Sequence, residues 1–224
     1  MTLSTDKNLD AGFNKPVQDR LLDVAEELFC EHGFERTSVR QLAAAAACNV
    51  AAVNYYFGGK DNLYLEVWRR HIKLMREARL ESIKNAMSQN QGSPQLEDLL
   101  SSFARSFIGP LVDEGKAPRL MKLMAREMID QHLPENLFVE EMVKPTMAAM
   151  GQALLKVCPG LDESKVPLVI FSIAGQLINA VHVKAMSEQT NTAQMPMPDL
   201  NETIDHIVNF SAAGIRAYAR PATE

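Results

Sequence analysis

Apolar residues recur every three or four positions along most of this chain, which is the spacing of one face of an α-helix. The first clear stripe consists of Val17, Leu21, Val24, Ala25, Leu28 and Phe29. Gly33 follows it and suits a helix end, because glycine adopts the left-handed backbone of a C-terminal cap without steric cost. The pattern predicts a first helix over residues 17–31.

Two short helices joined by a tight turn are predicted next. Ser38 and Gln41 have the spacing of a capping box, in which each side chain bonds the backbone of the other residue; Thr37 is the alternative N-cap. Asn49 suits the N-cap of the second short helix, whose body covers residues 50–56. Small residues in its first turn let the backbone lie deep in a groove of DNA. The pair therefore predicts a DNA-reading motif.

Helical spacing continues to the end of the chain. Gly58 and Gly59 end the second short helix, and a long helix is predicted over residues 60–87 with Leu63, Val67, His71 and Leu74 on its buried side. Further helices are predicted over residues 96–111, 118–131, 134–157, 166–189 and 198–220. Polar loops over residues 88–95 and 190–197 separate some of them. The prediction is an all-α protein of about nine helices.

Composition and the distribution of charge along the chain indicate how it is divided into domains. The 224 residues are 46% hydrophobic and 23% charged, which is enough for two globular domains. The polar residues 1–16 contain no signal peptide and predict a disordered arm. The net charge is −5, but residues 1–88 are balanced and the excess of acidic residues lies beyond them. A neutral first domain can bind phosphates, whereas an acidic second domain repels DNA.

Four segments, residues 21–29, 33–34, 37–42 and 49–60, together resemble the N-terminal domain of the tetracycline-repressor (TetR) family of transcriptional regulators. The similarity covers about residues 17–70. Three residues depart from the family pattern: Ala47 replaces a turn glycine, Tyr56 a common histidine, and Gly59 a common serine. If Ala47 has a positive φ, it carries strain of about 1–2 kcal/mol.

The resemblance implies a three-helix helix-turn-helix DNA-binding domain over residues 17–62 and a helical ligand-binding and dimerisation domain over residues 63–224. It places Thr37, Tyr56 and Lys60 near phosphates and four residues of the second short helix toward the bases. Tyr56 has an alternative role, because its ring can pack between helices. The full set expected at DNA is Thr37, Ser38, Asn49, Val50, Ala51, Ala52, Asn54, Tyr55, Tyr56 and Lys60.

The second half is similar to the CecR-type branch of the family through the stretches KPTMAAMGQALL and IFSIAGQLINAVH. Methionine and phenylalanine are frequent here, and thioethers fit irregular apolar shapes, so an effector pocket is expected. The residues expected to line it are Phe103, Phe107, Met124, Met128, Phe171 and Gln176. Ordinary core packing is the alternative role for these side chains.

Residues 166–186 form the most apolar stretch and are nearly long enough to span a membrane. Gln176, Asn179, His182 and Lys184 within it make spanning costly, so a buried or dimer-interface helix is favoured. The first three recur at helical spacing and suit either a pocket wall or a hydrogen-bonded dimer seam. Ala174 and Gly175 permit close helix approach, and together with the apolar stripe over residues 204–218 they predict a four-helix dimer interface.

Several other classes of function lack support in the sequence. Three separated cysteines, Cys30, Cys48 and Cys158, predict neither a disulfide framework nor a metal site, and the reducing cytoplasm is the expected compartment. Cys48 at the turn suits a redox switch or, more simply, a small buried apolar residue. No catalytic or cofactor motif is present, so we expect no enzyme activity, metal or cofactor.

The leading hypothesis is a cytoplasmic homodimer that represses transcription from a palindromic operator on double-stranded DNA. A small apolar or aromatic effector would release it. The alternative is an all-α binding or scaffold module that no longer binds DNA, a possibility favoured only by Ala47 in the turn.

Overall fold

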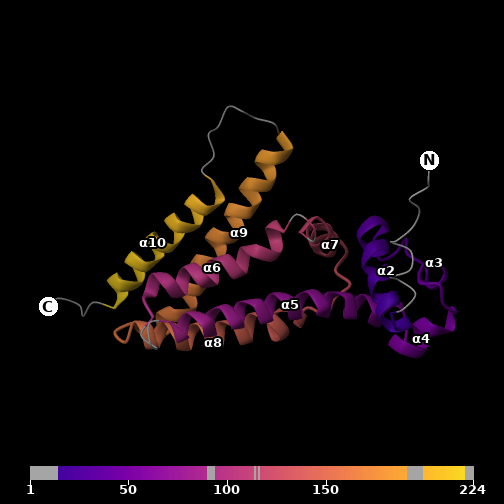
Figure 1. Ribbon diagram of the computed structural model, residues 1–224, viewed down its shortest axis with the longest axis horizontal. Helices are drawn as coiled ribbons and strands as arrows, with labels where there is room; N and C mark the ends of the chain where they lie inside the picture. The colour runs from indigo at the N-terminus through magenta and orange to yellow at the C-terminus, as the bar shows by residue number, and fades with distance from the viewer. Residues whose placement is uncertain (1–14, 90–93, 114, 116, 191–198, 220–224) are drawn as a thin grey trace, which may run out of the picture. The chain divides into compact units, whose positions relative to one another are not determined.

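The computed structural model describes residues 15–89, 94–113, 115, 117–190 and 199–219, and their regular structure is entirely helical (Figure 1). The α-helices are α2 (Val17–His32), α3 (Val39–Ala45), α4 (Ala51–Phe57), α5 (Lys60–Ser88), α6 (Leu96–Val112), α7 (Ala117–Asp130), α8 (Lys144–Val157), α9 (Val166–Thr190) and α10 (Leu200–Tyr218). A π-helical turn, Val139–Val143, precedes α8, and a 3-10 turn, Glu163–Lys165, precedes α9. The all-α prediction is confirmed. The predicted arm and the loop over residues 190–197 lie almost wholly outside the described residues.

Local chemistry sets the helix ends where the sequence predicted them. Gly33 has φ 82° and donates its N–H to Phe29 O, ending α2. Ser38 begins α3 with both bonds of the capping box to Gln41 present. Gly58 ends α4 in the left-handed conformation at φ 74°, where glycine has no Cβ to clash. These caps confirm the predicted helix-turn-helix boundaries to within two residues.

The predicted buried stripe of α5 needs one correction. Leu63 and Val67 are buried as predicted, but Leu74 is 52% exposed. Ile72 and Met75 are buried instead. The helical period does not explain this change, because Leu63 and Leu74 are about three turns apart and lie on the same face of α5. The change coincides with the point between His71 and Ile72 where α5 passes from the first compact unit to the second.

The described residues form two compact units whose boundaries differ from the predicted split after residue 62. The first unit runs to His71 and also includes Pro118–Glu135; the second contains Ile72–Ala117 and Asn136 onward. Helix α5 contributes to both units, whereas nearly all of α7 belongs to the first. The cause is packing: the Tyr64 ring of α5 meets the rings of Phe29 and Phe34 edge to face, with centroids 5.0 and 5.1 Å apart, and its hydroxyl bonds Glu127 of α7.

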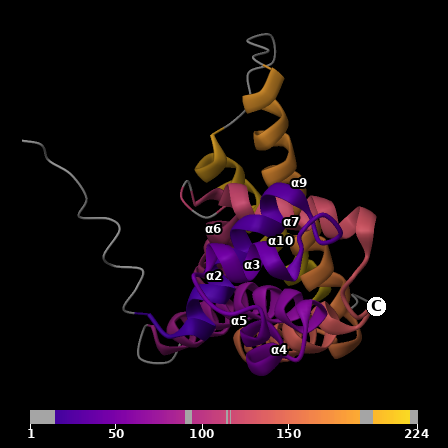
Figure 2. The same ribbon diagram turned by 90° about the vertical axis from the view of Figure 1, so that its right-hand side faces the viewer.

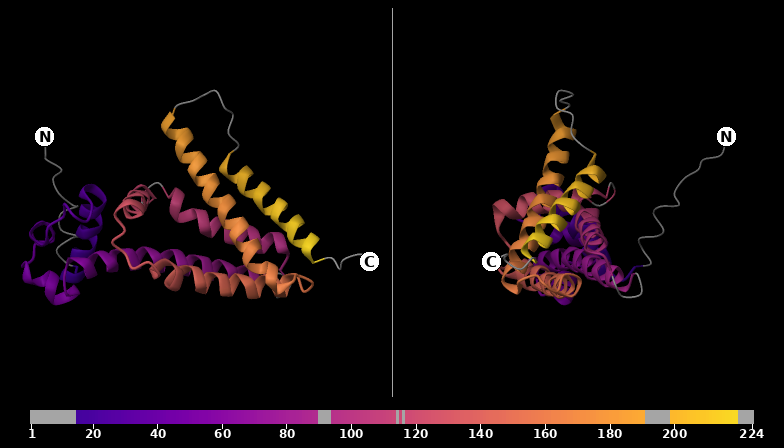
Figure 3. Two further views of the ribbon diagram at one scale, coloured as in Figure 1. Left: turned by 180° about the vertical axis from the view of Figure 1, so that it is seen from behind. Right: turned by 90° about the vertical axis from the view of Figure 1, so that its left-hand side faces the viewer.

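In the second unit, α6, α9 and α10 pack side by side, and α8 runs beside the second part of α5 (Figures 1 and 3). The core is aliphatic and aromatic, with Leu99, Phe103, Met150 and Leu177 at most 1% exposed. At one edge, Arg216 of α10 donates two hydrogen bonds to the carboxylate of Glu97 on α6, at 2.5 and 2.7 Å. This forked ion pair joins the ends of two helices that are far apart in the sequence.

The Glu97–Arg216 pair gives a pH-dependent prediction. The Arg216 guanidinium holds the pKa of Glu97 below its usual 4.5, so its stabilisation is complete above that pH and is lost as the pH falls through the lowered pKa. Because both side chains are partly exposed, we expect Glu97→Gln to cost at most about 1 kcal/mol at pH 7. Urea unfolding should show this difference at pH 7 and a much smaller one at pH 3. An equal difference at both pH values would contradict the assignment.

Candidate nucleic-acid interface

The connection before α3 is held by Thr37, which is only 1% exposed. Its hydroxyl donates to Gly33 O at 2.7 Å and its N–H donates to Phe34 O at 3.2 Å. Both donors are therefore used inside the first unit. The phosphate contact expected for Thr37 is not supported; the residue ties the connection before α3 to the end of α2.

The turn between α3 and α4 is tight because Ala47 has a left-handed backbone with φ 49°. This is the positive φ at which strain was predicted for Ala47. Cys48 N–H closes the turn on Ala43 O at 2.9 Å. Arg20 of α2 reaches the same turn: its Nε donates to Ala46 O at 3.1 Å and its Nη2 to Ala47 O at 3.4 Å. The guanidinium thus satisfies carbonyls that the end of α3 leaves open.

Ala47 supplies a second prediction. Replacing it by glycine removes the Cβ clash of the left-handed conformation, about 1–2 kcal/mol, but raises the entropy of the unfolded chain by about 0.4–1 kcal/mol. We expect Ala47→Gly to stabilise the protein by about 0.5–1 kcal/mol, measured as a higher urea midpoint at unchanged slope. Ala45→Gly, in a helical position of α3, is the matched control and should destabilise. Destabilisation by both changes would show that Ala47 is unstrained.

Helix α4 presents one exposed face of mixed polar and apolar groups. Asn49 Oδ1 accepts a hydrogen bond from Ala51 N at 2.8 Å, so Asn49 caps the start of α4 as predicted. Val53 and Phe57 are buried and anchor the opposite side. The exposed face contains Asn49, Val50, Ala51, Asn54, Tyr55 and Tyr56. Six of the ten residues expected at DNA thus lie together on or beside α4, the helix labelled in Figure 2.

Two tyrosines dominate this face. Tyr55 is 80% and Tyr56 41% exposed, and their rings meet edge to face with centroids 4.9 Å apart. Tyr56 therefore packs against its neighbour while its surface stays open to solvent. Both phenols combine a hydrogen-bonding tip with an apolar ring, a combination suited to bases and sugars.

The remaining expected residues lie within α4 or flank it. Ala52 lies within α4 and is half-buried, and the Ser38 hydroxyl is held 2.7 Å from Gln41 Oε1 in the capping box. Lys60 begins α5, donates to Phe34 O at 3.0 Å and lies 4.0 Å from the centroid of the Phe34 ring. Since an ammonium group has three donors, this bond leaves capacity for a phosphate.

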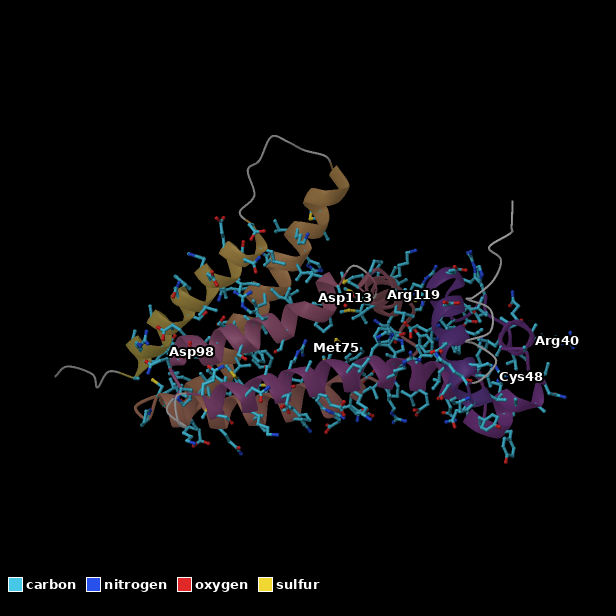
Figure 4. All side chains as sticks on the ribbon, in the orientation of Figure 1. Arg40, Cys48, Met75, Asp98, Asp113 and Arg119 are labelled. Atoms are coloured by element: carbon cyan, nitrogen blue, oxygen red, sulfur yellow. The ribbon has the colours of Figure 1, made fainter. Side chains whose placement is uncertain are left out.

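Two basic side chains were missed by the sequence analysis. Arg36 and Arg40 are exposed on the connection before α3 and on α3 itself, and Figure 4 shows Arg40 on the outer side of that helix. Arg40 is the one charged residue between Thr37 and Gly59 in the sequence, which was a usable signal. Both are candidates for phosphate contacts, because exposed guanidinium groups pair with phosphate oxygens.

Within the first unit, helix α7 is hydrogen-bonded to the end of α2 and to the first part of α5. Arg126 donates to the carbonyls of Cys30 and Glu31, at 3.2 and 2.8 Å, and so caps the end of α2. Glu127 accepts bonds from the Tyr64 hydroxyl at 2.8 Å and from Leu133 N at 2.7 Å. Burial raises the pKa of the Cys30 thiol to about 11, which keeps it unreactive. The scaffold beneath α4 is thereby fixed from a distant part of the sequence.

The six side chains expected to form an effector pocket are divided between the two units. Phe103 and Phe107 are buried in the second unit, with ring centroids 5.9 Å apart. Met124 and Met128 lie on α7 in the first unit, where Met128 is 80% exposed. Phe171 of α9 is 59% exposed. An enclosing role for Met128 and Phe171 is therefore not supported in the described chain, since both side chains point to solvent.

A shallow groove of about 190 Å³ lies instead on the outer side of α9 and α10, where Leu168, Gln176, Phe210 and Tyr218 contribute to its walls. Five apolar side chains of α9 and α10 expose 44–65% of their surface: Leu168, Phe210 and Tyr218 in the groove wall, and Phe171 and Ile178 on α9 outside the groove lining. By length and composition, the segment Glu163–Met186 also passes as a membrane span, with mean hydropathy 1.7, a test that core helices of soluble proteins pass too. Within the described residues, no group of three or more His, Cys, Asp and Glu could hold a metal ion.

Comparisons with known proteins agree with this geometry. Residues 21–67 match the family model "Bacterial regulatory proteins, tetR family", and residues 96–215 match the C-terminal domain of the "HTH-type transcriptional dual regulator CecR". CecR of Shigella flexneri is 23% identical over 194 residues, 85% of each chain. The probable regulator YttP of Bacillus subtilis is 34% identical over 88 residues, 38% of this chain and 42% of that protein.

A solved structure shows the same fold. FadR of Bacillus subtilis, determined in complex with stearoyl-CoA, superposes with a TM-score of 0.63 at 18% identity, over 88% of this chain and 98% of that one. The shared fold covers both the helix-turn-helix and the helical second unit.

Proposed function

Since the chain belongs to the TetR family of bacterial transcriptional regulators, in its CecR-like branch, we propose that it is a cytoplasmic, dimeric repressor of a palindromic operator. The observation that carries the proposal is the exposed face of α4, with Asn54 and Tyr55 held outward by buried Val53 and Phe57. A rigid short helix with polar tips is what the major groove of DNA accepts. Occupancy of an operator that overlaps a promoter blocks transcription.

A gel-shift with the DNA that flanks its own coding region tests this proposal. A shifted band should survive an excess of random competitor DNA. The alternative, an all-α carrier or scaffold without DNA binding, is motivated by the strained Ala47 turn and predicts no shift at any salt concentration.

Lys60 gives a third prediction. If its ammonium group pairs with one phosphate, Lys60→Ala should weaken binding to all sequences alike and reduce the salt slope of log K by about 1. Lys84→Ala, on the part of α5 in the second unit, is the matched control and should leave the slope unchanged. Because Lys60 also bonds Phe34 O, unfolding must be measured in parallel. An unchanged salt slope would remove Lys60 from the phosphate contacts.

Dimerisation is proposed to use the outer face of α9 and α10, defined above by its five exposed apolar side chains. An apolar patch of this kind is unfavourable in water, and two copies would bury it as a four-helix interface. The two recognition helices would then read half-sites about 34–36 Å apart or somewhat more. This is why a palindrome is expected.

Release by an effector is proposed to begin in the second unit and to reach α4 through α5 and α7. Helix α5 contributes to both units, and α7 directly follows α6 in the chain and bonds the end of α2 through Arg126. An effector must bind the state with low DNA affinity more tightly, and such coupling is typically about 1–3 kcal/mol. Linkage then requires operator DNA to weaken effector binding by the same factor. The complex of FadR with stearoyl-CoA is consistent with an apolar effector for this fold.

A further inference from the structure

One arginine in the second unit is buried without an acidic partner. Arg79 of α5 is 6% exposed, and its Nε has no hydrogen-bond partner within the described residues. Burial lowers the pKa of Arg79 to about 10, and no carboxylate counteracts that effect. Buried guanidinium groups are normally paired, because an unpaired charge in an apolar interior loses its hydration without compensation. Arg79 is therefore an unusual feature that packing alone does not explain.

Its neighbours leave the charge uncompensated. The Arg79 guanidinium carbon lies 4.0 Å from the centroid of the Phe107 ring, a cation–π contact that carries no negative charge. The hydroxyls of Ser82 and Ser106 lie 2.8 Å apart, and each is 2.8 Å from a backbone carbonyl, of Arg79 and Phe103 respectively. These hydroxyls thus bond one another and the backbone. The result is a polar seam between α5 and α6 that contains a cation and, among the residues that the structure describes, no anion.

A second unpaired polar atom lies in the same unit. Thr146 of α8 is 5% exposed, and its Oγ1 has no partner within the described residues. One turn before Arg79, Arg76 donates to Glu141 O at 2.9 Å, which fixes the π-helical turn before α8 against α5. Such π-helical turns are frequent at functional sites. Thr146 is thus a second unpaired polar group in the same unit, but the buried positive charge of Arg79 is the feature that a bound anion would satisfy.

We propose that Arg79 anchors the carboxylate of an apolar organic acid between α5 and α6, with Phe103 and Phe107 against its apolar body. This inference rests on the proposed ligand-responsive function and names its effector class. A guanidinium pairs with a carboxylate through two parallel N–H bonds. One positive charge balances a monoanion, whereas a phosphate monoester would keep an uncompensated charge in the apolar interior.

Thermal unfolding of the full chain tests the proposal with three apolar carboxylates, hexanoate, decanoate and phenylbutyrate, and with decanol and decyl phosphate. At least one carboxylate should raise the Tm of the wild type, and decanol at the same concentration should not. Decyl phosphate should act more weakly than decanoate. In Arg79→Met the carboxylate affinity should fall by roughly 10- to 150-fold.

Arg105→Met is the matched control, because Arg105 is an exposed arginine of α6 in the same unit. It should keep the wild-type response. Without ligand, Arg79→Met should have an unchanged Tm or one higher by about 2–4 °C, since an unpaired buried charge has been removed. The proposal is overturned if no carboxylate acts on the wild type, if decanol acts equally, or if Arg79→Met responds like the wild type.

Operator binding measured on the same samples separates this inference from the proposed function. A wild type that binds its operator but ignores all carboxylates overturns the inference alone. A wild type with an Arg79-dependent carboxylate response and no DNA binding overturns the repressor proposal and leaves the carboxylate site standing.

Discussion

Replacing Phe171 and Phe210 together by glutamate is expected to convert the proposed dimer into monomers and to lower operator affinity by about 100- to 10,000-fold. The two rings are 59% and 65% exposed in the single chain, so folding should tolerate the change. In a dimer the new carboxylates would be desolvated against an apolar partner surface, which is strongly unfavourable. Each recognition helix would then bind a half-site alone.

Sedimentation equilibrium and gel-shift titration on the same samples measure this effect. Leu74→Glu is the matched control, because Leu74 is an apolar residue of the second unit that is 52% exposed and lies outside the α9–α10 face. The control should stay dimeric and bind as the wild type does. A double variant that remains dimeric would place the interface elsewhere.

The second large effect is expected at Asn54. An asparagine amide can bond an adenine edge through two atoms, and such a contact is worth about 1–3 kcal/mol of discrimination. Asn54→Ala should therefore lower the affinity for the operator roughly 10- to 150-fold and change the affinity for random DNA little. Alanine is the better helix former, so α4 itself should not weaken.

Fluorescence anisotropy with labelled operator and with scrambled DNA measures both affinities. Asn85→Ala, an exposed position of α5 in the second unit, is the control and should change neither. Equal losses of affinity for the two DNAs would show that Asn54 contributes to binding of any DNA sequence and not to sequence discrimination.

The helix-turn-helix was predictable because its signals are local. The Ser38–Gln41 capping box, the Asn49 cap and the glycines that end α2 and α4 each act within a few residues. A pattern of this kind determines backbone geometry directly. The strain at Ala47 followed in the same way, from one residue in a turn that needs φ above zero.

The place of α7 was not predictable, because long-range bonds determine it. Arg126 reaches carbonyls of Cys30 and Glu31 more than ninety positions earlier, and Glu127 accepts from Tyr64. No periodicity within α7 indicates which unit it joins. For the same reason the sequence assigned Thr37 to DNA, although the fold buries its hydroxyl against Gly33 O.

The pocket prediction shows what residue type alone cannot distinguish. Phe103 and Phe171 are chemically identical, yet one is 1% and the other 59% exposed. Apolar character predicts that a side chain will be covered but not by what: its own core, a ligand or a second copy of the chain. Arg79 was not singled out from the sequence, because its unusual property is the absence of a counter-charge in the folded unit.

Selection of bound sequences from random double-stranded DNA, followed by measurement of the mass of the complex, tests the central claim most directly. Two α4 helices related by a dyad predict an inverted repeat with half-site centres about 34–36 Å apart or somewhat more, bound by two chains. Enrichment of a single half-site bound by one chain with full affinity, or no enrichment above random DNA, would contradict a dimeric operator-binding regulator.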